Sequence, residues 1–475
     1  MSAAASTPLQ TTPESTTLKV LIVGAGLGGL MLAALLERAG VDYEIFERAK
    51  KVVPLGSAIA FGANIMSLFE QLGVLDKIME NSKAIHESIL YNENNEVIGR
   101  RVFSYAKERY GHYTHVLARP VLYDLLLSLI PAHKVHMATK IISFTQDDNK
   151  VTIECEDKTF QGDMLVGADG AYSTVREQLY KQLSAKGAVP ESDLEKLPFT
   201  SSCLVGTTRP LDPEKYPFLT KPFCHFANMI ANPEIPYSRI NFSVKDNSIC
   251  WMIVDYLLDK ESTKADEAAH NGSSGKNSEW GPGAAEAMCN RVRNFMFAEK
   301  VSIGELIDQT PKELISKVML EEKLFETWYS GRTVLLGDAC HKMHPAAGLG
   351  AVSAMHDALI LANHLYDLNQ AVSRTMIRAS TIELEGVFKD YRDERFPMVA
   401  RSFAASKNMS RLTGPYRINQ ILRWLMNYIP RWLWFKMLDQ MQAYRPQATF
   451  LPLVKDLGMI PPMPQTSLKQ PIPTY

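Results

Sequence analysis

Three glycines near the start of the chain have the spacing of a phosphate-binding turn. Gly24, Gly26 and Gly29 follow the apolar run Lys19–Val23 and open a second apolar run of helical character. In such a turn the first glycine permits the tight bend, the second lets the backbone approach a pyrophosphate, and the third allows close packing of helix on strand. Glu47 lies eighteen residues beyond Gly29, where a carboxylate can accept a hydrogen bond from a ribose hydroxyl. The pattern predicts a dinucleotide-binding site, with a glycine-rich turn that holds no ligand as the alternative.

The elements that must position these residues alternate between strand and helix. Short apolar and β-branched runs predict the strands of a buried parallel sheet at 19–23, 41–46, 164–166 and 332–336. Helices are expected at 30–38, 64–72 and 121–130, and from residue 353 onward the chain reads as mostly helical. Three further runs predict a small antiparallel sheet at 135–138, 141–146 and 150–156. Alternating runs between 200 and 258 predict the sheet of a second domain.

The composition of the chain excludes several classes of protein. Its 475 residues include 51 Lys and Arg against 52 Asp and Glu, a formal net charge of −1 that gives no global attraction to nucleic acid. The six cysteines are scattered, with no C-x-x-C pair and no histidine at zinc-finger spacing, so a structural zinc site is not expected. Residues 1–17 lack the basic and apolar regions of a signal peptide and predict a disordered leader on a cytoplasmic protein.

Two later segments resemble the signature motifs of a known family. Residues 163–176, Asp-Met-Leu-Val-Gly-Ala-Asp-Gly-Ala-Tyr-Ser-Thr-Val-Arg, resemble the DG motif of class A, single-component flavoprotein monooxygenases. Residues 337–350, which begin Gly-Asp-Ala-Cys-His, resemble the GD motif with which that family holds its flavin. Arg119 matches the family's arginine that approaches the flavin, and residues 391–397 resemble the helix motif that follows the flavin site. The resemblance covers residues 18–400 and implies FAD as cofactor, with NADPH or NADH as a transient co-substrate.

The resemblance also implies which residues contact the cofactor. Asp338 would accept a hydrogen bond from a ribityl hydroxyl, and the backbone near Gly350 would favour negative charge on the reduced flavin. A helix cap remains the alternative role for Asp338, and a turn-stabilising role remains the alternative for Asp169. The expected cofactor-binding residues are Gly24, Gly26, Gly29, Glu47, Ala60, Arg119, Asp169, Asp338, Gly350 and Ala351. No catalytic side chain is assigned, because the oxidising chemistry belongs to the flavin.

The chain departs from the family pattern around the second glycine pair. Leu349, Val352 and His356 stand where the family usually has polar residues, so fewer polar contacts are expected at the flavin edge. His341 and His344 could be drawn with His356 and Asp357 as a metal cluster. The histidines flank a proline of the cofactor loop, and we interpret them as packing residues and expect no metal.

These observations predict an α/β fold: a Rossmann-like FAD-binding domain with an inserted β-rich substrate domain and a helical C-terminal tail. The expected divisions are a leader at 1–17, the first part of the FAD-binding domain at 18–200, the substrate domain at 201–319 with a flexible insertion at 261–285, the second part of the FAD-binding domain at 320–400, and the tail at 401–475.

The resemblance implies a reaction as well as a fold. The expected enzyme uses NAD(P)H and O₂ to hydroxylate or epoxidise an apolar aromatic or isoprenoid small molecule through a flavin C4a-hydroperoxide, and residues 205–213 are similar to fungal secondary-metabolism members of the family. Two alternatives stay open. One is an FAD-dependent reductase or dehydrogenase without oxygen insertion, and the other is a flavin-binding protein without catalysis.

The segment 417–441 raises a separate hypothesis. It interleaves three of the six tryptophans with basic residues, a composition typical of a membrane interface. Pro430 divides the segment, so neither half is long enough to span a bilayer. Packing of these helices against the body of the enzyme is the alternative to peripheral contact with an intracellular membrane.

Overall fold

A computed structural model describes residues 17–52, 58–257, 282–297, 301–426, 428–469 and 472. Residues 1–16 of the expected leader lie outside these ranges, and so do residues 261–281 of the expected flexible insertion. None of the helices in the described part of the chain combines the length and the apolarity that crossing a bilayer requires.

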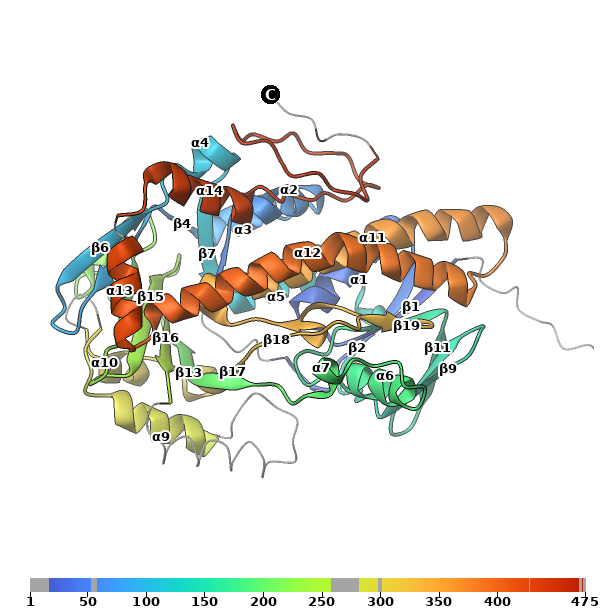
Figure 1. Ribbon diagram of the computed structural model, residues 1–475, viewed down its shortest axis with the longest axis horizontal. Coiled ribbons are helices and arrows are strands. Elements are labelled where there is room, and N and C mark those ends of the chain that lie inside the picture. The colour runs from blue at the N-terminus through green and yellow to red at the C-terminus, as the bar shows by residue number, and fades with distance from the viewer. Residues whose placement is uncertain are drawn as a thin grey trace, which may run out of the picture.

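The predicted parallel sheet is present and forms the centre of one half of the molecule (Figure 1). Its strands, in spatial order, are β19 (Tyr329–Ser330), β20 (Thr333–Leu335), β12 (Met164–Gly167), β1 (Lys19–Val23), β2 (Asp42–Phe46) and β8 (Val135–His136). All neighbours run parallel except β19, which is antiparallel to β20. The strands β1, β12 and β20 are almost wholly buried, which explains their apolar, β-branched sequences.

The position of β8 corrects one expectation. Residues 135–138 were predicted to join the small antiparallel sheet, but Val135 and His136 pair in parallel with Ile45 and Phe46 at the edge of the main sheet. The His136 ring stacks on Phe46 with ring centroids 4.9 Å apart. This contact stabilises the pairing of β8 with β2 at the edge of the large sheet. The antiparallel sheet therefore consists of β9 (Ser143–Gln146), β10 (Val151–Glu154) and β11 (Thr159–Gly162).

Helices pack against this sheet and against one another. Helix α1 (Leu27–Ala39) contacts α5 (Arg119–Leu127) and α11 (Gly350–Thr375), and α12 (Thr381–Thr413) lies along α11. Figure 1 shows α12 crossing most of the molecule. A three-stranded sheet of β3 (Ala58–Phe61), β7 (Thr114–Ala118) and β4 (Lys83–Ile85) leads into α5. The remaining helices of this half are α2 (Ala63–Gln71), α3 (Leu75–Glu80), α4 (Ala106–Tyr110), α6 (Thr174–Ser184) and α7 (Glu191–Leu194).

The second domain is built on a seven-stranded sheet. Its strands, in spatial order, are β17 (Ser316–Glu321), β13 (Phe199–Thr207), β16 (Ile249–Asp255), β15 (Tyr237–Ser243), β14 (Phe226–Met229), β5 (Glu87–Tyr91) and β6 (Val97–Val102). Helices α9 (Pro282–Val292) and α10 (Ile303–Asp308) share a buried core with Trp251 of β16. Strands β5 and β6 precede residue 200, so this sheet draws on a segment assigned above to the first part of the FAD-binding domain. The expected domain boundaries themselves remain predictions.

The C-terminal tail is helical only over its first part. Helix α12 is followed by α13 (Arg417–Met426) and α14 (Arg431–Gln442). From 443 to 469 the described chain has no helix or strand, so the helices of the expected helical tail end at Gln442. Five prolines between 446 and 464 remove backbone donors that helices need. Side-chain contacts hold this segment instead, among them a buried ion pair of 2.5 Å between Arg445 and Asp456.

Candidate cofactor site

The carboxyl ends of four neighbouring strands bring most of the predicted residues to one edge of the sheet. Gly24 follows β1, Glu47 follows β2, Asp169 follows β12 and Asp338 follows β20. In an open parallel sheet this edge is where ligands bind. A Cβ atom on Gly24 would lie 2.4 Å from the backbone oxygen of Ala168, so the two loops are in contact. The structure therefore brings together segments that are some three hundred residues apart in sequence.

The glycines of the first turn have different surroundings. Gly24 has a φ of 106°, which favours glycine, and its amide donates a hydrogen bond to Phe46. A Cβ on Gly29 would lie 2.0 Å from the Gly24 oxygen, so Gly29 is needed for close packing of α1. Gly26 caps α1, is exposed, and a Cβ on it would meet no atom within 4 Å. The start of α1 thus presents bare backbone to an open space, which fits a pyrophosphate.

Glu47 supports this turn. One oxygen of its carboxylate accepts a hydrogen bond from the Ala25 amide at 3.1 Å, and the other accepts one from the Ala49 amide at 2.9 Å. Each carboxylate oxygen can accept more than one hydrogen bond, so the group retains capacity for a ribose hydroxyl. The side chain is partly exposed beside the start of α1, where the sequence placed it.

Asp169 and Arg176 organise the DG motif. The Asp169 carboxylate accepts hydrogen bonds from the Ser173 hydroxyl at 2.5 Å and from the Val175 amide at 3.2 Å, so it stabilises the turn that leads into α6. Burial raises the pKa of this carboxyl group. The buried Arg176 donates to the Ala171 carbonyl at 2.6 Å and to the Ala339 carbonyl at 2.9 Å. Arg176 therefore ties the DG motif to the GD motif.

Asp338 has a cationic partner that sequence reasoning missed. Its carboxylate accepts a hydrogen bond of 2.7 Å from the ammonium of Lys342, four residues later. Burial opposes ionisation of Asp338, but the Lys342 charge outweighs it and lowers the pKa of the carboxyl group. Arg119, the exposed first residue of α5, adds to this effect, so the structure brings Arg119 and Asp338 into one electrostatic environment. Ala60 lies nearby on β3, whose partner strand β7 ends directly before Arg119.

The start of α11 completes the site. Gly348 has a φ of 65°, and neither Gly348 nor Gly350 would meet an atom within 4 Å if it carried a Cβ. Ala351 is partly exposed in the same first turn. A Cβ on Gly28 would lie 3.3 Å from the Cβ of Ala354, so the first turns of α1 and α11 are in contact. Two helix N-termini with bare backbone therefore face the same region, and both favour negative charge.

A buried ionic cluster holds the GD loop from behind. The Asp357 carboxylate contacts the His341 ring at 2.5 Å and accepts hydrogen bonds from Arg395 at 2.8 Å and from the Gly337 amide at 3.1 Å. All three side chains are fully buried. Burial opposes the Asp357 charge, yet His341 and Arg395 lower the pKa of the carboxyl group to about 2. The sequence groups His341 with Asp357 only in the metal cluster that we do not expect, and it contains no signal that links either residue to Arg395.

The same cluster includes Cys340, and one ligand atom from each of Cys340, His341 and Asp357 would fall within 4.8 Å of the others. Both Asp357 oxygens are already engaged by His341, Arg395 and the Gly337 amide. A cation placed here would meet the Arg395 guanidinium, which lies against the same carboxylate. We therefore interpret these side chains as a hydrogen-bonded cluster that supports the GD loop.

His356 links the start of α11 to the segment after β3. Its Nε2 donates to the Asn64 carbonyl at 2.8 Å, and burial lowers the pKa of the ring to about 3. An unfolded histidine has a pKa of about 6.5. The stability that the neutral His356 ring supports is therefore complete above about pH 6.5 and is lost as the pH falls towards 3.

We therefore predict that the free energy of unfolding declines as the pH is lowered from 7 to 5. His356 contributes up to about 1.4 kcal/mol for each pH unit in that window. Urea unfolding at several pH values measures this slope, and the His356→Gln variant should show a shallower one. Parallel curves for the two proteins would rule out His356 as a source of the acid sensitivity.

Comparisons with known proteins agree with this geometry. The family described as "FAD binding domain" matches residues 17–204 and 300–379, more than half of the chain. The FAD-dependent monooxygenase esdpE of Penicillium shearii is 26% identical over 405 residues, which cover 83% of this chain and 78% of that protein. The FAD-dependent monooxygenase ptmM of Penicillium ochrochloron is 26% identical over 403 residues, which cover 82% of this chain and 88% of that protein.

Solved structures show the same fold. HpxO of Klebsiella pneumoniae, complexed with FAD and uric acid, aligns with a TM-score of 0.65 at 17% identity, and the alignment covers 86% of this chain and 92% of HpxO. These findings confirm the Rossmann-like domain, the β-rich second domain and the family resemblance that the motifs indicated. The chain therefore belongs to the FAD-binding-domain family, and it is an FAD-dependent oxidoreductase of the monooxygenase class.

Proposed function

We propose that this enzyme uses NADPH or NADH together with O₂ to hydroxylate or epoxidise an apolar aromatic or isoprenoid small molecule. The observation that carries the proposal is the meeting of two bare helix N-termini, at Gly26 and Gly350, on one edge of the sheet. This arrangement suits an extended cofactor with a pyrophosphate in its middle and a flavin at one end. The similarity to fungal FAD-dependent monooxygenases supports the reaction class.

The bound FAD would supply the chemistry of oxygen activation and oxygen transfer. The residues of this chain would bind and orient it. The amides at the start of α1 would hold the pyrophosphate and Glu47 the ribose. Asp338, kept ionised by Lys342, would accept the hydrogen bond of a ribityl hydroxyl. The positive end of α11 would favour negative charge on the flavin ring.

A substrate screen with isotopic oxygen tests the proposed reaction. Each candidate compound is added to the purified holoenzyme with NADPH or NADH under labelled O₂. The expected result is a compound that stimulates nicotinamide oxidation and gains one labelled oxygen atom. Turnover without labelled oxygen in any product would favour a reductase or dehydrogenase. A bound flavin that no nicotinamide reduces, with any compound, would favour a protein without catalysis.

We also propose that α13 and α14 make peripheral contact with a membrane. The support is an apolar helix face that points into solvent: Ile418, Ile421, Leu422 and Leu425 of α13 are each between 37% and 60% exposed. The polar Asn419 of the same helix is buried. Tyr428 and Trp432 are exposed beside it, as expected at a lipid interface.

We predict that the double variant Ile421→Ser, Leu425→Ser binds vesicles at least about tenfold more weakly, because two large apolar side chains lose their burial in lipid. Co-sedimentation with vesicles that contain anionic phospholipid measures this binding. Ile382→Ser is the matched control, because Ile382 is 83% exposed at the other end of α12. The proposal fails if the wild-type protein does not sediment with vesicles, or if the control loses as much binding as the double variant.

A further inference from the structure

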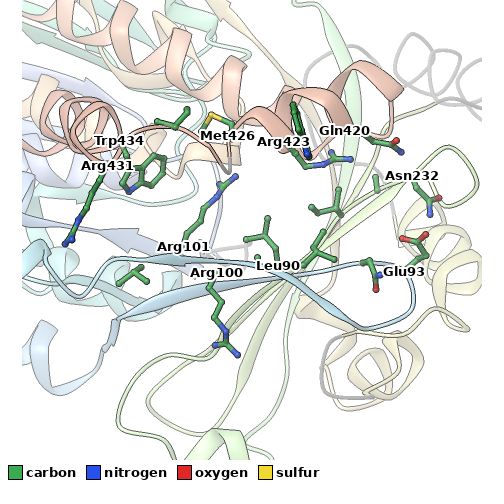
Figure 2. Close-up of a pocket in the computed structure, with 18 of the residues that line it drawn as sticks. Leu90, Glu93, Arg100, Arg101, Asn232, Gln420, Arg423, Met426, Arg431 and Trp434 are labelled. Carbon is green, nitrogen blue, oxygen red and sulfur yellow. The ribbon is translucent and has the colours of Figure 1, made fainter.

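A cavity of about 740 Å³ lies between strands β5 and β6, at one end of the seven-stranded sheet, and the helices α13 and α14 (Figure 2). Cavities of this size accommodate one small organic molecule. Its lining contains none of the predicted cofactor-binding residues. Much of that lining is apolar and aromatic: Leu90, Ile98, Ile230, Met426, Trp434 and Phe435. The cavity therefore offers apolar contact outside the cofactor site.

Arg101 is the feature of the cavity that packing does not explain. It stands on β6 opposite Ser88, and Figure 2 shows its side chain rising between the strands and the helices. Its guanidinium contacts the sulfur of Met409 at 3.5 Å. Among the residues that the structure describes, no carboxylate forms an ion pair with Arg101. Burial lowers the pKa of the guanidinium, and no neighbouring charge offsets this effect.

The other charged residues that line the cavity are Arg100, Arg423, Arg431 and Glu93. Arg100 pairs with Glu87 at 2.7 Å, and Figure 2 shows it pointing away from Arg101. Arg423 donates to the carbonyls of Leu412 and Gly414 and so anchors α13. Glu93 is the one carboxylate in the described lining, and it lies near Asn232, away from Arg101 (Figure 2). Arg431 also lines the cavity, and its guanidinium lies 5.1 Å from the centre of the Phe435 ring. The lining thus combines apolar and polar side chains, and Arg101 is a cation in it that has no ion-pair partner within the described part of the chain.

A half-buried cation without an anionic partner is costly, and a bound anion removes that cost. Desolvation penalises the guanidinium, whereas a charge-assisted hydrogen bond from arginine to a carboxylate or phosphate is among the strongest that proteins form. The aromatic wall next to Arg101 would at the same time take up an apolar body. Together these features select a ligand that combines an anionic group with an apolar body.

We propose that this cavity binds an amphiphilic small molecule, with its apolar body against Trp434 and Phe435 and its carboxylate or phosphate on Arg101. The assignment of that molecule as the enzyme's substrate rests on the proposed function, whereas binding itself does not. The wall is held in place, because Trp434 donates to the Tyr105 hydroxyl at 3.0 Å and Asp439 of α14 pairs with Arg109 at 2.8 Å.

Helix α14 also connects the cavity to the cofactor site. Its Gln442 side chain approaches Gly62, where a Cβ would lie 2.4 Å from the Gln442 oxygen. Gly62 follows β3, the strand that carries Ala60. A ligand in the cavity would therefore contact helix α14. This helix in turn contacts the segment next to the expected flavin contacts.

A matched pair of probes tests the inference without turnover. Laurate and dodecanol have the same chain and differ in charge, and calorimetry of the holoenzyme measures the binding of each. Arg101→Met removes the charge and keeps an unbranched side chain. We expect it to weaken laurate binding by about tenfold to one hundredfold and to leave dodecanol binding within about twofold. Arg101→Lys should retain part of the laurate affinity, because the charge remains.

Arg100→Gln is the control. It removes the guanidinium of the adjacent residue, and that guanidinium already forms an ion pair with Glu87. It should leave the affinity for laurate unchanged. The proposal is overturned if laurate and dodecanol bind wild-type enzyme equally, or if both arginine variants weaken laurate alike. It is also overturned if Arg101→Met abolishes sedimentation with anionic vesicles while Arg100→Gln does not, because the ligand would then be a lipid headgroup. None of these results depends on oxygen insertion, so a failure here is distinct from a failure of the proposed reaction.

Discussion

Replacement of Gly26 by valine is expected to leave the protein folded and to abolish FAD binding. The backbone of Gly26 has a φ of −74°, which any residue can adopt, and a Cβ there would meet no protein atom within 4 Å. The side chain would instead occupy the space in which the pyrophosphate must approach the amides of α1. We expect FAD affinity to fall by at least about 100-fold, which corresponds to about 2.7 kcal/mol. Equilibrium dialysis of the apoprotein with FAD measures the affinity, and thermal unfolding without FAD measures the stability.

Two other glycines provide the comparison. Gly386→Val places the same side chain in open space on α12 and should change neither quantity. Gly29→Val should prevent folding, because its Cβ would lie 2.0 Å from the Gly24 oxygen. If Gly26→Val binds FAD as the wild type does, the N-terminus of α1 is not the pyrophosphate site.

Loss of the Asp357 carboxylate is expected to be the most destabilising single polar change in the site. The Asp357→Leu variant leaves the fully buried Arg395 without its carboxylate and the Gly337 amide without its acceptor. Removing one partner of a buried ion pair costs about 3–5 kcal/mol, because the other charge stays desolvated. Urea unfolding at neutral pH measures this loss. FAD binding should weaken as well, because Asp357 positions the loop that carries Asp338.

The double variant Asp357→Leu, Arg395→Met separates this explanation from simple loss of packing. With both charges replaced by apolar groups, most of the lost stability should return. If the double variant is as unstable as the sum of the single variants, the two residues do not act as a pair. The depressed pKa of Asp357 adds a pH test. Its contribution to stability is complete above the unfolded pKa of about 3.9 and is lost as the pH falls towards 2.

Much of the fold and the identity of the cofactor could be predicted from the sequence. The βαβ opening was predictable because the glycines punctuate two apolar runs of different period, and the structure has β1, α1 and β2 there. The DG and GD motifs were recognisable because each follows a buried strand. Their meeting at one sheet edge follows from parallel topology, and the pairing of β1 with β12 and of β12 with β20 confirms it. The individual cofactor contacts stay predictions.

The rest depends on contacts between distant residues, which composition and spacing do not encode. The Lys342 partner of Asp338 lies only four residues away and could have been found as an i, i+4 pair. The pairing of Asp357 with Arg395 could not, since it requires the packing of α12 on α11. The edge position of β8 and the pairing of β5 and β6 with the second sheet likewise depend on tertiary contacts. Arg101 carried no sequence signal, because only its lack of a partner in the fold sets it apart.

We propose that one FAD molecule extends from the N-terminus of α1 to the N-terminus of α11. A crystal structure of this protein with FAD bound tests it most directly. We expect the pyrophosphate within hydrogen-bonding distance of the backbone at Gly26, the ribityl chain at Asp338, and the flavin ring beside Gly350. A flavin bound elsewhere, or a pyrophosphate that does not contact the first turn of α1, would contradict it.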